Sequence, residues 1–222
     1  MRIRKKKWAQ SVIDTSRQII RFNYLDLNES DKKKFDLEKY FSNKNPICVE
    51  LGCGKGKFIN QMALECPNKN FVAIEKYFDI IATGVRRANN SFSNLVFIMD
   101  DIKNLEKYFF DMRINGLYIN FCDPWPKNKH AKRRLTHKNF LDIYKKLLAP
   151  GAGIFLKTDN QNLFEFSLNE FSESGFRLKN IFFDLHKKKI CDNNINMRIK
   201  TEYEEKFLGL GMPIFYCEAY LI

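Results

Sequence analysis

Residues 47 to 56 read ICVELGCGKG, and this stretch decides the fold of the chain. The residues of a short, mostly apolar strand lead into three glycines that alternate with other residues. Glycine has no Cβ, so a strand can turn sharply into a helix there and leave its backbone open to a ligand. The stretch therefore predicts a ligand-binding loop between a strand and a helix.

The acid within this stretch indicates the ligand. A pyrophosphate cofactor favours bare helix amides, whereas the sulfonium and ammonium groups of S-adenosylmethionine are cations that gain from a carboxylate such as Glu50. The dinucleotide fingerprint needs its third glycine three residues after the second, where this chain has Lys57, and Gly56 comes one residue earlier. We therefore favour S-adenosylmethionine over NAD. A tight turn without a ligand is the structural alternative.

From residue 46 onward, short apolar runs alternate with longer periodic segments. This is typical of strands buried on both faces and joined by crossover helices. Right-handed crossovers then predict an α/β fold with a doubly wound, mostly parallel, seven-stranded sheet that ends in an antiparallel C-terminal hairpin. The expected strands are 47–51, 71–75, 95–99, 117–121, 154–158, 176–185 and 214–221. The expected helices are 57–65, 79–89, 136–148 and 163–174, with Pro150-Gly151 separating the third from its strand.

The length of 222 residues suits one large α/β domain, and 45 % hydrophobic residues suffice for its core. We expect residues 1–45 to form a basic N-terminal arm and lead-in, and residues 46–222 to form the domain. The polar, basic and Asn-rich segment 187–200 predicts a mobile surface loop.

The formal charge of +12 implies a polyanionic partner, which is either nucleic acid or an acidic membrane. No run of about 18 or more apolar residues is present to cross a bilayer. The first eight residues, MRIRKKKW, lack the apolar stretch of a signal peptide. Nucleic acid and a cytoplasmic location are therefore the better predictions.

The six cysteines are scattered, with no Cys-x-x-Cys pair and no histidine at a zinc spacing. We expect reduced thiols and no metal. Cys53 and Cys122 flank the suspected site, but nothing in the sequence positions a base beside either, which argues against a nucleophilic role.

Acidic residues close the next two expected strands. Glu75 lies about 20 residues past the glycines, where an acid accepts the ribose hydroxyls of a nucleoside, and a surface carboxylate is the alternative. Asp100 and Asp101 end the third strand, within reach of an adenine amino group. The apolar run favours Asp101, although the sequence leaves both open.

The fourth strand ends in NFCDPWP, residues 120–126. Two prolines fix φ around Trp125 and hold Asp123 in a rigid, aromatic corner. The following run KNKHAKRR, residues 127–134, is tethered to this corner, so phosphate contact is favoured over a merely solvated charge run. A structural turn remains the alternative for the corner.

Together with several further motifs, the glycine loop and the corner at 120–126 make the chain resemble the bacterial tRNA (guanine-N7)-methyltransferases over residues 1 to 222. The strings DPWPK at 123–127 and TEYEEKF at 201–207 are nearly diagnostic. Further matches are Arg2-x-Arg4 and Trp8, VELGCGKG at 49–56, KRRL at 132–135 and KTDN at 157–160. The resemblance departs at Asn128, where a basic residue is common, and in the long basic loop before Thr201.

The resemblance implies a Rossmann-like class I methyltransferase domain at 46–222. Its cofactor would be S-adenosylmethionine, with S-adenosylhomocysteine as the product, and its substrate the variable-loop guanosine 46 of tRNA. The implied cofactor contacts are Glu50, Gly52, Gly54, Gly56, Glu75, Asp101 and Asp123. The implied substrate contacts are Lys127, Asp159, Thr201, Glu202, Tyr203 and Glu204. The implied RNA contacts are Lys129, His130, Lys132, Arg133 and Arg134.

Guanine N7 carries a free lone pair, so its methylation needs alignment rather than a base. Positive charge moves onto the purine as the bond forms, and Asp123, as the catalytic residue, and Asp159 are suited to stabilise it. The rivals are a methyltransferase acting on another target, a non-catalytic RNA-binding module and a nicotinamide dehydrogenase. The sequence leaves a monomer and a homodimer open.

Overall fold

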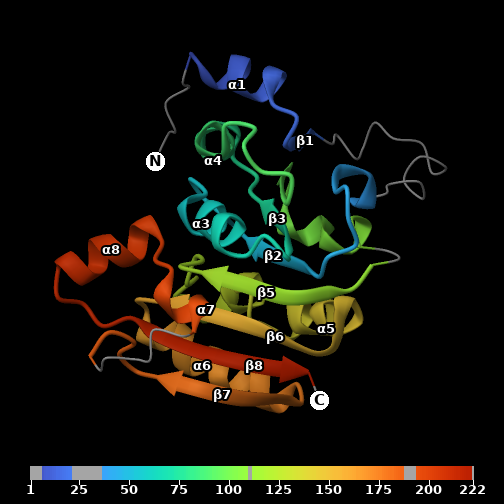
Figure 1. Cartoon of the computed structure of the whole chain (residues 1–222). Coiled ribbons are helices and arrows are strands. Elements are labelled where there is room, and N and C mark those ends of the chain that lie inside the picture. Colours follow the sequence, from blue (N-terminus) through green and yellow to red (C-terminus); the bar gives the residue numbers. More distant parts are fainter. Residues whose placement is uncertain (1–6, 22–36, 110–111, 188–193, 222) are drawn as a thin grey trace. The chain divides into compact units, whose positions relative to one another are not determined.

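The computed structural model describes residues 7–21, 37–109, 112–187 and 194–221. The chain divides into two compact units, Met1–Met112 and Arg113–Ile222 (Figure 1). Each unit contains four of the described strands, with helices between them. None of the helices in the described ranges combines the length and the apolar character that crossing a membrane requires.

The first unit is built on parallel strands in the order β1-β4-β3-β2. Every residue of β2 and β3 is buried, as continuous apolar runs predict for strands covered on both faces. The strands are β1 (Ile19–Arg21), β2 (Ile47–Leu51), β3 (Asn70–Ile74) and β4 (Leu95–Met99). The helices are α1 (Ala9–Thr15), η2 (Leu37–Tyr40), α3 (Lys57–Glu65), α4 (Phe78–Ala88) and η3 (Ile102–Lys107).

The described part of the expected N-terminal arm packs onto this unit. Helix α1 buries Ala9 and Ile13, which lie four residues apart on one helical face, and it packs against α4. Strand β1, which the sequence pattern did not predict, pairs with β4, so that Ile19 lies opposite Phe97. The compact units divide between residues 112 and 113. The lead-in over residues 1–45 and the domain over residues 46–222 stay a prediction.

The second unit has a mixed sheet in the order β5-β6-β8-β7. β5 and β6 are parallel, and β8 runs antiparallel to both β6 and β7, which gives the expected antiparallel C-terminal pairing. Its strands are β5 (Ile114–Asn120), β6 (Leu148–Thr158), β7 (Phe176–Phe182) and β8 (Phe215–Leu221). Its helices are η4 (Asn128–Arg133), α5 (Lys138–Leu147), α6 (Gln161–Glu173), α7 (Ile195–Arg198) and α8 (Glu202–Gly209).

Two local expectations for this unit are corrected. Strand β6 begins at Leu148, directly after α5, and Pro150-Gly151 lie inside it. The β5–β6 pairing shifts register there, from Ile114 opposite Leu148 to Gly116 opposite Gly153, so the extra residues lie on β6. Residues 194–200, expected in a mobile loop, contain the helical turn α7 (Ile195–Arg198), and Met197 and Ile199 are buried. Residues 188–193 of that loop lie outside the described residues.

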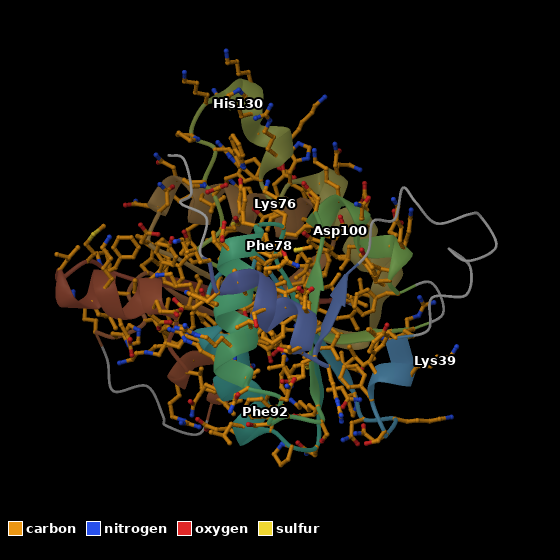
Figure 2. The ribbon with its side chains drawn as sticks, turned by 90° about the horizontal axis from the view of Figure 1, so that it is seen from above. Lys39, Lys76, Phe78, Phe92, Asp100 and His130 are labelled. Atoms are coloured by element: carbon orange, nitrogen blue, oxygen red, sulfur yellow. The ribbon has the colours of Figure 1, made fainter. Side chains whose placement is uncertain are left out.

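The carboxyl ends of the strands in the first unit lie together. Figure 2 shows Lys76, Phe78 and Asp100, which follow β3 and β4, at one end of the unit, and Phe92 at the opposite end. The glycine loop joins the same edge, because the amide of Gly52 donates to the carbonyl of Ile74, the last residue of β3, at 2.9 Å. Parallel α/β sheets bind their ligands at this edge.

Candidate functional site in two sets of residues

The glycine loop after β2 leaves open space over its backbone. Gly52, Gly54 and Gly56 have φ of 72°, 56° and 71°, a conformation that other residues rarely adopt. A Cβ on Gly54 would meet no described atom within 4 Å, and one on Gly52 would meet only Ile102 Cδ1 at 4.0 Å. Ligand atoms can therefore rest on the backbone at these two glycines.

Glu75 is held against this loop. Its carboxylate accepts hydrogen bonds from the amide of Gly54 at 3.3 Å and from the amide of Tyr77 at 3.0 Å. The side chain is only 8 % exposed, and burial raises the pKa of the Glu75 carboxyl, although these amides oppose the rise. The structure thus brings Glu75 to the loop, and Glu50 lies buried near the end of the neighbouring strand β2.

The neighbouring acids after β4 have different surroundings. The carboxylate of Asp100 accepts hydrogen bonds from the amide of Asp101 at 2.6 Å, from Asn104 Nδ2 at 2.9 Å and from the hydroxyl of Tyr108. Asp101 uses one oxygen to cap η3 through the amide of Lys103 at 3.0 Å. Asp100 thus already accepts hydrogen bonds from three donors, whereas Asp101 uses one oxygen for its cap.

In the second unit, the corner after β5 has an unusual backbone. Phe121 and Trp125 adopt φ of 50° and 42°, although neither is glycine. Left-handed backbone at such bulky residues costs on the order of 1–3 kcal/mol each, and it persists only where the surroundings hold it. Asp123 lies between the two and is exposed. Strain of this kind clusters at functional sites.

Arg134 braces this corner from the inside. Its Nε donates to the carbonyl of Pro124 at 3.1 Å, and its Nη2 donates to the carbonyl of Trp125 at 3.1 Å. The guanidinium lies 4.3 Å from the ring centroid of Phe166, and the residue is only 8 % exposed. The predicted RNA contact is therefore a buried cation that holds the corner carbonyls.

The remaining cations of the basic run lie on the surface. Helix η4 has no buried residue, and Figure 2 shows His130 on it, with nitrogen-tipped side chains pointing outward. The guanidinium of Arg133 lies 4.8 Å from the ring centroid of Trp125, and the His130 ring meets the same indole edge-on at 5.7 Å. Lys127, Lys129 and Lys132 are exposed. These side chains are available to phosphates.

The residues at the end of β6 have separate roles. The hydroxyl of Thr158 accepts a hydrogen bond from the amide of Asn160 at 3.1 Å, and Asn160 caps α6 by accepting one from the amide of Leu163 at 2.9 Å. Asp159 is partly exposed beside them. The amide of Phe121 donates to the carbonyl of Lys157 at 2.8 Å, so the segment after β6 adjoins the corner after β5.

Glu204 lies inside a buried network. Its carboxylate is 3.0 Å from Lys157 Nζ and 2.8 Å from His186 Nε2, and the residue is 0 % exposed. Thr201 and Glu204 form a capping box at the start of α8. Burial opposes ionisation, but the hydrogen bond from His186 and the charge of Lys157 outweigh it and hold the pKa of Glu204 below its usual range.

Helix α8 packs onto the Asp123 corner through aromatic rings. The ring of Phe121 stacks with Tyr203 at 6.3 Å and with Phe207 at 6.1 Å between centroids. Tyr203 keeps 58 % of its surface exposed, so one side of this stack is open. The structure therefore brings the two predicted motifs of the second unit together, although 80 residues separate Phe121 from Thr201 in the sequence.

The described cysteines are free thiols, and Cys191 lies outside the described residues. Burial, assisted by the charge of Asp123, raises the pKa of Cys122 to about 12. Such a thiol is not a nucleophile at neutral pH. Among the described residues, no group of three or more His, Cys, Asp or Glu side chains is arranged to hold a metal ion.

Sequence reasoning gave no role to Lys157 or His186. A signal for Lys157 was present, because a lysine that ends the apolar run Ile154-Phe155-Leu156 in a buried strand needs partners inside the protein. His186 lies next to a basic segment, and nothing in its sequence neighbourhood distinguishes it from a surface residue.

Solved structures confirm the fold class. The crystal structure of the 16S rRNA methyltransferase KamB matches with a TM-score of 0.61 over 88 % of this chain and 94 % of that chain, at 11 % identity. Precorrin-6y C5,15-methyltransferase from Geobacter metallireducens matches with a TM-score of 0.53 over 91 % and 94 %, at 9 % identity. The chain therefore has the Rossmann-like α/β methyltransferase fold.

Sequence relatives define the family within this class. A family described as "Putative methyltransferase" matches residues 44–217. The chain is 45 % identical to the tRNA (guanine-N(7)-)-methyltransferase of Brevibacillus brevis over 84 % of this chain and 86 % of that protein. It is 42 % identical to the protein of that name in Clostridioides difficile over 99 % and 98 %. The chain belongs to the tRNA (guanine-N7)-methyltransferase family.

Proposed function

We propose that this chain transfers a methyl group from S-adenosylmethionine to N7 of guanosine 46 in the variable loop of tRNA, in the cytoplasm, releasing S-adenosylhomocysteine. The observation that carries the proposal is the exposed Asp123, held in a strained and braced corner beside a cation-bearing helix. This corner occurs in a chain that is 42 % identical over 99 % of its length to a tRNA (guanine-N(7)-)-methyltransferase.

The first unit holds the methyl donor in this proposal. The open backbone at Gly52 and Gly54 suits a flat ligand, and the third glycine, Gly56, sets the start of α3. When bound, S-adenosylmethionine supplies an electrophilic methyl group on a positively charged sulfur. Carboxylates suit such a cation and the hydroxyls of its ribose, and the unit offers Glu50, Glu75 and Asp101.

The second unit holds the acceptor. Guanine N7 attacks through its own lone pair, so the protein has to align the base and stabilise the positive charge that develops on it. Asp123 and Asp159 follow the neighbouring strands β5 and β6 and accept hydrogen bonds from the N1 and N2 edge of the guanine. Asp123 is the catalytic residue in this proposal, because its carboxylate stabilises the positive charge that develops on the purine.

The start of α8 contributes the remaining substrate contacts. Tyr203 offers an exposed ring for a base, and Thr201 and Glu202 lie beside it. Glu204 has no exposed surface, so we assign it to holding this turn rather than to touching the base. Lys127, which is exposed at the end of the corner, binds a substrate phosphate.

The tRNA backbone binds along η4. Lys129, Lys132 and Arg133 provide cations on its surface, and His130 offers a ring nitrogen beside them. The net charge of +12 favours association with a polyanion. Arg134 contributes by bracing the corner, because its guanidinium already donates to the Pro124 and Trp125 carbonyls.

The test is methylation of unmodified tRNA with labelled donor, followed by mass spectrometry of the nucleosides. We expect 7-methylguanosine at position 46, and no label on a matched transcript with adenosine there. Label on an exocyclic amine or on another nucleotide would overturn the proposed target. Donor binding without any methylation would favour an RNA-binding module, and binding of a nicotinamide cofactor instead would favour a dehydrogenase.

A further inference from the structure

The long side chain of Lys157 points into the interior of the second unit. It is 1 % exposed, and Nζ donates to the carbonyls of Met197 at 3.2 Å and Ile199 at 2.8 Å. The same nitrogen lies 3.2 Å and 3.0 Å from the two carboxylate oxygens of Glu204. One ammonium therefore joins strand β6, the turn around α7 and the start of α8.

An arrangement of this kind is poorly explained by stability alone. Removing an ammonium and a carboxylate from water costs several kcal/mol per ion, and well-packed apolar residues in their place are often equally stable. Hydrogen bonds to fixed carbonyls have a different effect, because they define where those backbone atoms lie. A buried lysine that donates to two backbone carbonyls and to one carboxylate fixes the geometry of the segment around it.

The fixed segment is residues 194–200, which we call the strap. Asn194 Nδ2 donates to Glu218 Oε1 at 3.2 Å, which ties one end of the strap to β8. The hydroxyl of Tyr118, on β5, donates to Asn196 Oδ1 at 3.0 Å. Glu218 is oriented in turn by the hydroxyls of Tyr216 and Tyr220, each at 2.7 Å.

The other end of the strap leads directly into the proposed substrate contacts. Ile199, whose carbonyl Lys157 holds, is two residues before Thr201, and Thr201 caps α8 through the amide of Glu204 at 3.0 Å. The amide of Thr201 donates back to Glu204 Oε2 at 3.3 Å. Lys157 thus contacts the backbone before this capping box and the carboxylate within it.

We propose that Lys157 is a positioning residue for the methyl acceptor. It acts through the strap and Glu204, and it holds Thr201, Glu202 and Tyr203 in one orientation relative to Asp159, which lies two residues after Lys157 in the chain. Lys157 does not touch the substrate. This inference rests on the proposed function of the Thr201 segment, and it adds a residue to which neither the sequence motifs nor the family resemblance gave a role.

The variants separate positioning from folding. Lys157→Met keeps most of the length of the side chain and removes its donors, which leaves Glu204 as a buried carboxylate with fewer partners. The double variant Lys157→Met/Glu204→Gln removes both buried charges and restores stability by the argument above. Lys138→Met is the matched control, because Lys138 also pairs with a carboxylate, Asp142 at 2.8 Å, but on the exposed surface of α5.

The first measurement is amide hydrogen exchange of Lys157→Met without substrate. We expect faster exchange in residues 194–204 and unchanged exchange in β5, β6 and α6, because the loss is local. The control variant should match the wild type throughout. An even rise in exchange across the second unit would show that Lys157 stabilises the whole unit, and it would overturn the proposal.

The second measurement compares kcat with binding in the double variant. We expect kcat at saturating tRNA to fall by about tenfold or more, since small displacements of a reacting group carry losses of up to about 100-fold. The dissociation constants of tRNA and donor should stay within about threefold, because η4 and the glycine loop are untouched. A wild-type kcat in this variant would reduce Lys157 to a structural residue, and a parallel loss of both affinities would refute local positioning.

The proposed function fails independently of this inference. If the wild-type protein places its methyl group elsewhere than on N7, the exchange pattern of Lys157→Met still reports whether the lysine holds the strap. If methylation occurs at N7 while residues 194–204 exchange as in the wild type, the proposed function survives and the positioning role is refuted.

Discussion

Gly56 and Gly84 meet backbone to backbone where α3 begins beside α4. A Cβ built on Gly56 would lie 2.9 Å from the Cα of Gly84, closer than real side chains come. Asn60 reinforces the contact, because its Nδ2 donates to the carbonyl of Gly56 at 2.7 Å and to that of Gly84 at 3.3 Å. The third glycine of the loop therefore serves helix packing, whereas Gly52 and Gly54 leave room for a ligand.

This contact predicts that Gly56→Ala damages both the stability and the donor affinity of the protein. The left-handed backbone costs an alanine about 1–2 kcal/mol, and overpacking typically adds a further 1–3 kcal/mol. We expect the melting temperature to fall by several degrees and the Kd for S-adenosylmethionine to rise. Gly209→Ala is the control, since its Cβ meets open space at an ordinary φ. Equal melting curves for the two variants would contradict the packing role.

Asp123→Asn should abolish most activity without unfolding the protein. The exposed carboxylate makes no contribution to the core, but an amide cannot stabilise positive charge on the purine in the same way. We expect kcat to fall by about 100-fold or more with tRNA affinity nearly unchanged. Asp142→Asn, an exposed carboxylate on α5, is the matched control and should retain full activity. Full activity of Asp123→Asn would remove this residue from the mechanism.

Arg133 and Arg134 should respond differently to the same replacement. Arg133→Ala removes a surface cation, so tRNA binding weakens and its dependence on salt becomes shallower, while kcat at saturation is retained. Arg134→Ala releases two corner carbonyls, so kcat falls and the protein loses stability, with little change in the salt slope. Filter binding across a salt series and single-turnover methylation distinguish the two. Equal salt slopes for both variants would contradict the assignment.

The parts of the fold that the sequence predicted are those determined by local patterns. Strands 47–51 and 95–99 and helix 57–65 begin and end as expected, because continuous apolar runs and the glycines specify them locally. Glu75 lies at the glycine loop for the same reason, since parallel strands place their carboxyl ends at one edge.

The parts that the sequence did not predict depend on partners far away in the chain. Arg133 and Arg134 are the same residue type in adjacent positions, and only Phe166 and the corner carbonyls make one of them buried. The strap was expected to be a mobile loop because its polar composition hides two buried apolar residues. Its anchor Tyr118 lies 78 residues from Asn196, which no local pattern reveals.

Cys122 should be unreactive despite lying next to Asp123. Its pKa of about 12 leaves almost no thiolate at pH 8. We expect alkylation of this thiol in the folded protein to be much slower than that of a free cysteine, as measured by mass spectrometry after a timed pulse. Cys122→Ala should retain kcat within about threefold, since the reaction needs no nucleophile from the protein. Rapid alkylation that also stops methylation would contradict both expectations.

The ionised carboxylate of Glu204 should stabilise the protein at neutral pH, and this stabilisation should be lost in acid. Its folded pKa is lowered from the ordinary value of a glutamic acid, so the unfolded chain binds more protons in the interval between the two values. The stabilisation is therefore complete above about pH 5 and is lost as the pH falls through the folded pKa. The wild type should unfold at a higher denaturant concentration than Glu204→Gln at pH 7. This difference between the two midpoints should become smaller as the pH is lowered towards 3. Glu205→Gln, an exposed neighbour on α8, should show no such trend. An advantage that stays constant across this range would mean that the carboxylate is not ionised in the network with Lys157 and His186.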